Sequence, residues 1–349
     1  MTSKPPIDLL ATFARFGREQ RMSLRDPKFA ERFTGAVTEK LAEALGNDIL
    51  LHGQRTENMF EALVVSLGHY KLLKREDVGI VHPEGLYTAA DFRVHLHDGT
   101  QWLIEVKNVY DADPGRQRFR IRPQDFDRLK SYALAMNCPL KFALYWARWR
   151  IWTLVDADDL ILTEEKLTID MFKAAPMNEM GRLGDRTIGT KPPLKLRLFA
   201  DKSKPRSISA SGELALTVSH AAVFCGEAEI TDPVERNIAW IFMEFGDWEC
   251  GEPQVAMGDD DQVRAIEFQW TPRERLNEHE AFELIGTLSS MFSRYYATKT
   301  LGEDGVLQTE AELTPDWFAP LVANDQKGSA LPLWRFNLQT ARDNSEKPS

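Results

Sequence analysis

The chain has 349 residues, of which 43% are hydrophobic and 28% charged, a composition typical of a globular protein with a sizeable core. Its length favours two domains. The net charge of -10 argues against a surface coated in basic residues for binding nucleic acid. Three widely spaced cysteines form neither a CxxC pair nor a disulfide framework, which favours a reducing compartment. The sequence shows no secretory signal pattern, and no stretch approaches the ~20 apolar residues that span a bilayer. We therefore expect a cytoplasmic protein with no membrane partner.

Helices are predicted for the first part of the chain. Apolar residues recur at helical spacing within residues 1–50, which we expect to form a helical segment that packs on the following domain. A further helix is predicted over residues 56–72, with Thr56 as its cap and Glu57 in its first turn. Gly68 should end or loosen this helix.

Two strands of alternating polarity follow, DFRVHLH at 91–97 and QWLIEVK at 101–107, with the hairpin signal Asp98-Gly99 between them. After them we predict a helix at about 123–136 and two strands at 141–149 and 150–156. This order of elements indicates an α/β layered plan.

The composition of the sequence changes from about residue 176. Glycine, proline and polar residues over 176–192 predict a linker. Beyond it, short strands, a helix capped by Asp232 and a strongly patterned helix at 279–296 predict a second domain, of α+β type, at 193–340. We expect residues 341–349 to be a disordered tail of the chain.

Charged residues of the predicted hairpin form the pattern D-x13-E-x-K, which comprises Asp91, Glu105 and Lys107. Strand alternation places Glu105 and Lys107 on one face, where burial is costly unless the two side chains serve a site. Carboxylates suit hard cations such as Mg²⁺, and a bound cation lowers the pKa of its water. A nearby lysine can orient or deprotonate that water, or stabilise charge directly.

The length of the hairpin loop decides whether this site can form. A two-residue loop would pair His97 with Thr100 and turn Asp91 away from Glu105 and Lys107. A three-residue loop over residues 98–100 would instead pair Asp91 with Lys107, so that all three charged side chains share a face. We predict this odd loop, or a bulge, with a positive φ at Gly99.

The three residues resemble the motif of the PD-(D/E)xK nuclease superfamily over about residues 50–156, although Ala90 replaces the proline that often precedes the aspartate. The resemblance implies a restriction-endonuclease-like α/β fold, a mixed sheet flanked by helices, over residues 51–175. It also implies catalysis by Asp91, Glu105 and Lys107 with Mg²⁺ or Mn²⁺ as cofactor.

The same resemblance extends to two flanking helices. In Holliday-junction resolvases a helix glutamate precedes the glycine that ends the helix, and Glu57 resembles that metal ligand, with Glu61 as the alternative. In the RecB-like and type I restriction branches a Gln and a Tyr follow the catalytic strand. Gln124 and Tyr132 match them and could share a helix face with Arg128, which implies contacts with nucleic acid.

A local excess of basic residues follows the proposed catalytic strand. Between Lys107 and Arg150 the chain has ten basic and four acidic residues. Such a segment suits a polyanion held close to a metal, with Arg118 and Arg122 as phosphate contacts. An ordinary solvated surface is the alternative interpretation.

These patterns favour a Mg²⁺-dependent endodeoxyribonuclease of restriction, antiviral (phage) defence or DNA repair, with RNA as a substrate left open. Cutting two strands with one centre per chain favours a homodimer. The alternative is a non-catalytic nucleic-acid-binding protein on a nuclease-like scaffold. A further hypothesis gives residues 193–340 the main role, as a sensor of a small ligand or a phage protein that regulates the chain.

Overall fold

The computed structural model separates the chain into two compact units, Met1–Gln54 and Arg55–Ser349. The described residues are 9–76, 82, 84–209, 211–274, 282–322 and 327–337. None of the helices in these ranges is both long and apolar enough to cross a membrane.

The first unit contains α1 (Leu9–Gln20), α2 (Phe29–Leu45) and the start of α3 (Asp48–Leu67). The predicted helices are therefore present. Aromatic rings join α1 to α2, mostly edge to face, which is a favoured geometry for such pairs. That this segment packs on the following domain remains a prediction.

Helix α3 begins at Asp48, eight residues earlier than predicted at 56. Thr56 is buried inside the helix, so its predicted role as a cap is wrong. No proline or glycine cluster interrupts the pattern between these positions, and Asp48 supplies the favourable negative charge of the first turn. The helix stops at Leu67, five residues before the predicted bound at 72, and it ends at the glycine expected to end or loosen it, since Gly68 takes a φ of +67°.

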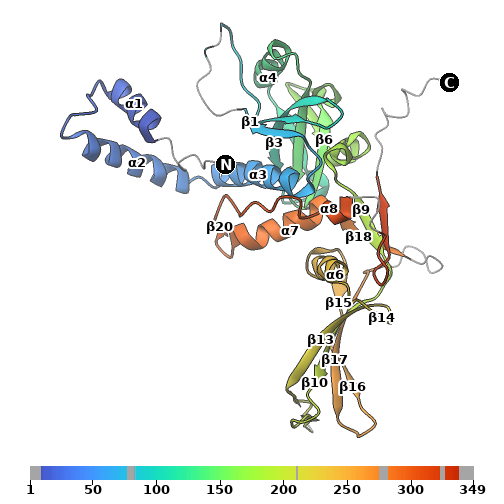
Figure 1. Ribbon diagram of the computed structural model, residues 1–349. Helices are drawn as coiled ribbons and strands as arrows, with labels where there is room; N and C mark the ends of the chain where they lie inside the picture. The colour runs from blue at the N-terminus through green and yellow to red at the C-terminus, as the bar shows by residue number, and fades with distance from the viewer. Residues whose placement is uncertain are drawn as a thin grey trace, which may run out of the picture. The chain divides into compact units, whose positions relative to one another are not determined.

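The first sheet is mixed, with the strand order β1-β2-β3-β5-β6 (Figure 1). Strands β3 and β5 run parallel, and the other neighbours are antiparallel. The bounds are β1 (Leu72–Arg75), β2 (Phe92–His95), β3 (Gln101–Val109), β5 (Leu140–Trp146) and β6 (Ile151–Asp156). Four of these strands were predicted, and only the edge strand β1 was not.

Helices cover both faces of this sheet. Phe60 of α3 packs with Phe92 and Ile104 on one face. On the other face, Phe126 of α4 (Pro123–Ala135) packs with Phe142. Strand alternation explains the two layers, since successive side chains of β2, β3 and β5 point to opposite faces. The chain thus has mixed α/β content, as predicted.

A small antiparallel sheet that the sequence did not reveal adjoins the α4 layer, in the order β4-β8-β7. Its strands are β4 (Arg118–Ile121), β7 (Ile161–Thr163) and β8 (Lys166–Asp170). Phe119 of β4 is buried against Phe142, so part of the basic segment lies on a strand anchored in the core.

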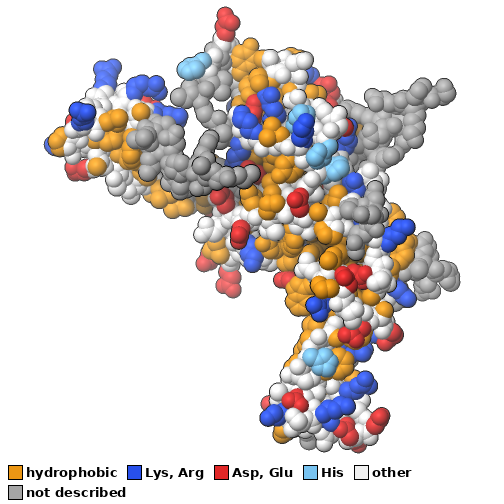
Figure 2. Space-filling view, in the orientation of Figure 1, with side chains coloured by type: hydrophobic (Ala, Val, Ile, Leu, Met, Phe, Trp, Pro, Cys, Tyr) orange, Lys and Arg blue, Asp and Glu red, His pale blue; other side chains and the backbone are white. Residues whose placement is uncertain are grey.

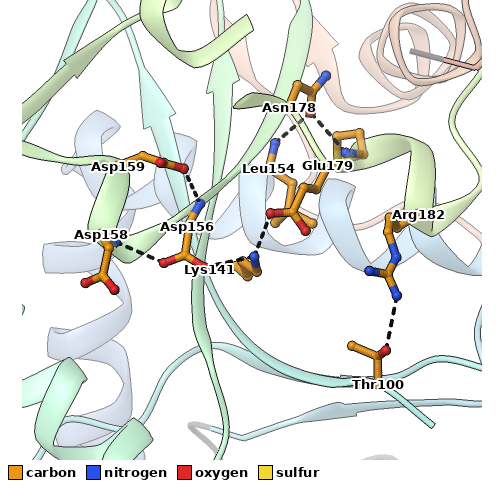
Figure 3. A network of polar contacts seen from close by, with 10 residues as sticks. Thr100, Lys141, Leu154, Asp156, Asp158, Asp159, Asn178, Glu179 and Arg182 are labelled. Atoms are coloured by element: carbon orange, nitrogen blue, oxygen red, sulfur yellow. Dashed lines mark hydrogen bonds and ion pairs between the residues drawn. The ribbon is translucent and has the colours of Figure 1, made fainter. Parts of the chain in front are cut away.

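The segment predicted as a linker, 176–192, is instead ordered and partly buried. It contains 3-10 turns and the strand β9 (Thr187–Thr190), and Leu183 and Ile188 are fully buried. A polar network in Figure 3 ties it to the first sheet, because the buried Lys141 donates to both Asp156 and Glu179. Polar side chains of this segment thus bond to groups of the first sheet.

The later strands form two further sheets, with the orders β14-β13-β10-β17-β15 and β18-β9-β21, and β16 pairs with β17. Their bounds are β10 (Leu194–Ala200), β13 (Val218–Cys225), β14 (Ala228–Glu229), β15 (Glu249–Cys250), β16 (Gln254–Met257), β17 (Val263–Thr271), β18 (Glu283–Thr287) and β21 (Leu333–Phe336). The short elements are β11 (Ser207–Ile208), β12 (Leu214–Ala215), β19 (Leu301–Gly302), β20 (Gly305–Val306), α5 (Met171–Ala174) and α8 (Ala319–Val322).

Helices of this part show one success and one error of the sequence pattern. Helix α6 (Pro233–Phe245) is capped by Asp232 as predicted. The predicted helix 279–296 is wrong in its first half, where β18 lies, and α7 (Leu288–Thr300) begins only after it. Gly286 has a φ of +124° that a helix does not allow, and the hydroxyl of Thr287 caps α7 by accepting from Ser290 N.

One hydrophobic core joins the α3 face of the first sheet to α6 and α7. The indole of Trp152, on β6, donates to the hydroxyl of Ser293 on α7 at 3.0 Å. A division into two domains at 176–192 remains a prediction, and residues 341–349 and 279–281 lie outside the described residues.

Candidate active site

The site rests on the register of the β2–β3 hairpin. His95 pairs with Gln101, and Leu96 N donates to Thr100 O at 2.9 Å, which leaves a three-residue loop of residues 97–99. Gly99 takes a φ of +91°. The predicted odd loop and the predicted positive φ are therefore confirmed.

The detailed register nevertheless differs from the prediction, which placed the loop at 98–100 and Asp91 opposite Lys107. Phe92 pairs with Ile104, and continuing this register sets Asp91 opposite Glu105. The carboxylate of Asp98 accepts from Thr100 N at 2.8 Å, which stabilises the earlier turn. A shift by two residues keeps the face unchanged, so Asp91 and Glu105 still point the same way.

Asp91 is fixed to β3 through its own side chain. It is buried, and its Oδ2 accepts from Val106 N at 2.6 Å. The main chain on its other side is held as well, because Glu76 N donates to Asp91 O at 2.8 Å. Asp91 is thus anchored between β3 and the end of β1.

Glu105 and Lys107 lie on the α4 face of β3, beside apolar neighbours of β5. Their partners on β5 are Phe142 and Leu144, both fully buried. Lys107 Nζ lies 2.6 Å from Glu105 Oε1. The other oxygen, Glu105 Oε2, is buried and has no hydrogen-bond partner in the described part of the chain. A buried carboxylate oxygen without a partner is costly, and it marks this position as a place for a ligand.

The electrostatics of the pair follow from burial and from like charges. Burial is the main cause that raises the pKa of Glu105 to about 7; the charges of Asp91 and Glu57 act in the same direction and Lys107 opposes them. Burial opposes the charge of Lys107, yet the carboxylates of Glu105 and Asp91 raise the pKa of Lys107 above its ordinary value. Lys107 is therefore a firmly protonated group.

The two candidate glutamates of α3 have different surroundings. The charge of Glu57 acts on both Glu105 and Lys107. Glu61, one turn later, forms a salt bridge with Arg75 of β1 instead. The structure therefore brings Glu57, rather than Glu61, into the electrostatic environment of the site.

The predicted metal site is not a fully assembled cluster. Among the side chains that the structure describes, no group of three or more His, Cys, Asp or Glu residues is placed to hold a metal ion. The facing carboxylates are Asp91 and Glu105, and Lys107 bonds to one oxygen of the second. The positive charge needed by these two acids thus comes here from a lysine.

The basic segment after β3 carries less free charge than its sequence suggests. Arg122 Nε lies 2.7 Å from Asp125 Oδ2, and Arg118 Nη2 lies 3.7 Å from Asp170 Oδ2. Lys130 and Lys141 also pair with acids, from residues 156–158 and 179. The charges of Arg118 and Arg122 remain at the surface, and Gln124 is exposed beside them.

Tyr132 and Arg128 of α4 do not form a simple exposed platform, since both are only partly exposed. The hydroxyl of Tyr132 donates to Glu76 Oε1 at 3.0 Å. Glu76 also binds Lys74 and Arg93. No sequence pattern indicates this cluster, because the four-residue edge strand β1 is too short to show a recognisable alternation.

Comparisons with known proteins do not place the chain in a family. No family model matches the chain, and no curated protein matches it. Among solved structures, the chain is similar to Hjc, a Holliday junction resolvase from the archaeal hyperthermophile Archaeoglobus fulgidus. That likeness has 19% sequence identity and a TM-score of 0.31, and it covers 38% of this chain and 98% of the resolvase. A likeness this weak carries no argument about function, which therefore depends on the site itself.

Proposed function

We propose that the chain is a metal-dependent nuclease that hydrolyses phosphodiester bonds of DNA. The observation that carries the proposal is the pair of buried carboxylates, Asp91 and Glu105, on one sheet face, with the partly exposed Lys107 bonded to Glu105. Burying two carboxylates side by side destabilises a fold unless the charges serve a site. The odd hairpin loop is what allows this arrangement.

A divalent cation such as Mg²⁺ or Mn²⁺ fits these residues. The partnerless Glu105 Oε2 and the facing Asp91 offer hard oxygen donors, and Glu57 adds negative charge nearby. When bound, such a cation lowers the pKa of a coordinated water and stabilises negative charge on the phosphate. In this proposal Asp91 and Glu105 hold the cation, and Glu57 is the additional acid from α3.

Lys107 acts as a cation in this proposal and not as a base. Its raised pKa keeps the ammonium protonated at neutral pH, so it has no free lone pair to accept a proton from water. It can orient the attacking water and stabilise charge on the phosphate oxygens. Before a cation binds, the same ammonium neutralises Glu105.

The surface of β4 and α4 supplies the proposed DNA contacts. Arg118, Arg122 and Gln124 reach solvent at the start of α4, and Arg128 and Tyr132 continue along the helix. We propose a homodimer that cuts both strands in restriction, phage defence or repair. Residues 193–340 would bind the regulating protein or small ligand.

A non-catalytic nucleic-acid-binding protein is the second candidate. It is favoured by the bond from Lys107 to Glu105 and by the lack of a three-acid cluster among the described residues. The two candidates differ in one outcome, because only the nuclease breaks phosphodiester bonds.

The test is a cleavage assay with plasmid, linear, single-stranded and branched DNA in Mg²⁺ or Mn²⁺. Asp91→Ala and Glu105→Ala should each abolish cleavage without unfolding the chain, because each change removes a proposed ligand. Glu57→Ala should reduce cleavage more than Glu61→Ala does. Asp127→Ala, at an exposed carboxylate of α4, is the matched control. Full activity of both Asp91→Ala and Glu105→Ala would refute the proposal.

A further inference from the structure

Two cations at the edge of the first sheet share a single carboxylate. Lys74 of β1 pairs directly with Arg93 of β2, so both side chains lie on the same face. Lys74 Nζ lies 3.1 Å from Glu76 Oε2, and Arg93 Nη2 lies 2.7 Å from Glu76 Oε1. The cluster of Lys74, Glu76 and Arg93, here called the edge cluster, therefore has one more positive than negative charge.

The edge cluster adjoins the candidate active site. Arg93 follows Asp91 by two residues on β2, and strand alternation turns both toward α4, the face that also carries Glu105. Glu76 N is bonded to Asp91 O. In Figure 2, Lys and Arg side chains gather over β1 and its neighbours. Any polyanion that approaches Asp91 and Glu105 along this face passes the two cations.

Hydrogen bonds within the edge cluster fix the carboxylate of Glu76, while some N–H donors of the two cations remain available to a ligand. The Glu76 side chain is only 5% exposed and also accepts from Tyr132, whereas the Lys74 side chain is 60% exposed. Arg93 donates from Nη2 to Glu76, and its Nε is buried without a hydrogen-bond partner among the described residues. Lys74 thus presents its ammonium to solvent, and the guanidinium of Arg93 has more donors than its bond to Glu76 uses.

We propose that Lys74 and Arg93 bind a backbone phosphate of DNA next to the phosphodiester that is cut, an inference that rests on the proposed nuclease function. Glu76 and Tyr132 are positioning residues that hold the two cations toward α4. This differs from the arrangement at Arg122, whose exposed charge is matched by its own acid, Asp125. Because Lys74 and Arg93 share one carboxylate, one net positive charge of the edge cluster remains for the ligand.

The experiment measures the affinity of the full chain for a fluorescent DNA duplex over a range of salt concentrations, in EDTA so that no bond is cut. Lys74→Gln should weaken binding and lower the slope of log K against log salt by about 0.9, the value for one phosphate contact. The matched control is Lys71→Gln, which removes an exposed lysine three residues away, on the opposite face by strand alternation. It should leave the slope unchanged.

Two further variants separate binding from a structural role. Tyr132→Phe removes a bond to Glu76 but no cation, so it should keep the wild-type slope. Arg93→Lys should retain part of the affinity that Arg93→Gln loses. Equal slopes for wild type, Lys74→Gln and Lys71→Gln would overturn the inference, as would an equal fall of the salt slope in Lys74→Gln and Tyr132→Phe.

The inference and the proposed function fail in different ways. If the chain cleaves DNA but Lys74→Gln leaves the salt slope unchanged, the edge cluster is only structural and the nuclease stands. If Lys74→Gln lowers the slope but no substrate is cleaved, the phosphate site stands and the nuclease fails. In the cleaving enzyme, Lys74→Gln should raise KM and leave kcat near the wild-type value.

Discussion

Replacing Glu105 with glutamine should change how the stability of the metal-free protein depends on pH. Burial raises the pKa of Glu105 to about 7 from an ordinary 4.5. Between these values the folded chain keeps a proton that the unfolded chain has released. The free energy of unfolding should therefore fall as the pH rises through this interval and become level above it. Glutamine does not titrate, so Glu105→Gln should lack this fall.

The expected size follows from the two pKa values. One pH unit corresponds to about 1.4 kcal/mol, so the interval from 4.5 to about 7 amounts to about 3 kcal/mol. This quantity is the change with pH in the difference between the unfolding free energies of Glu105→Gln and wild type. Any constant cost of the substitution, such as a weaker bond to Lys107, cancels from it.

Urea unfolding of both proteins at several pH values, with EDTA present, measures this change. The advantage of Glu105→Gln over wild type should grow by about 3 kcal/mol from pH 4.5 to pH 8. Glu303→Gln, at an exposed carboxylate, is the control and should follow the wild type. A difference between Glu105→Gln and wild type that stays constant with pH would refute the reasoning, because Glu105 would then ionise as it does in the unfolded chain.

Three further perturbations test other parts of the structure. Combined Arg118→Glu and Arg122→Glu should weaken DNA binding and flatten its salt dependence, and an unchanged slope in anisotropy titrations would make both arginines ordinary surface residues. Glu235→Gln should lower the unfolding free energy by on the order of 2 kcal/mol at pH 7, because this buried carboxylate accepts from N–H groups of residues 329–331. Burial opposes its charge, but these bonds hold the pKa of Glu235 below its ordinary value, so the deficit in urea unfolding should shrink below about pH 4.5. Gly99→Ala should cost about 1 kcal/mol, since its φ of +91° disfavours a Cβ, and an unchanged Tm would contradict this.

The sequence was most informative where chemistry and geometry constrain each other. The face shared by Asp91 and Glu105 could be predicted, because only an odd loop brings both to one side of the sheet. The exact position of the loop could not be predicted, because three-residue loops at 97–99 and at 98–100 both place Asp91 and Glu105 on the same face. Which of the two loops forms depends on local hydrogen bonds, such as the one from Thr100 N to Asp98 Oδ1. The alternation of polar and apolar residues does not predict such bonds.

Contacts between segments far apart in the chain could not be predicted from the sequence. The pairing of Glu61 with Arg75 removes Glu61 from the site, but it depends on an edge strand of four residues. The segment 176–192 looked like a linker because its residues are polar. In the structure, Glu179 and its neighbours bond to groups of the first sheet, and only the fold reveals those partners.

The net charge of -10 can be reconciled with binding to a polyanion through the placement of the cations. Acids from outside the basic segment, such as Asp158 and Asp170, offset much of its excess. On the proposed function, DNA would meet positive charge at Arg118 and Arg122 and, beside the carboxylates, at Lys74 and Arg93. Each phosphate contact contributes about 0.9 to the salt slope, so a protein with few such contacts should bind with a shallow dependence on salt. If the proposed nuclease function holds, such weak general attraction leaves substrate selection to the candidate active site.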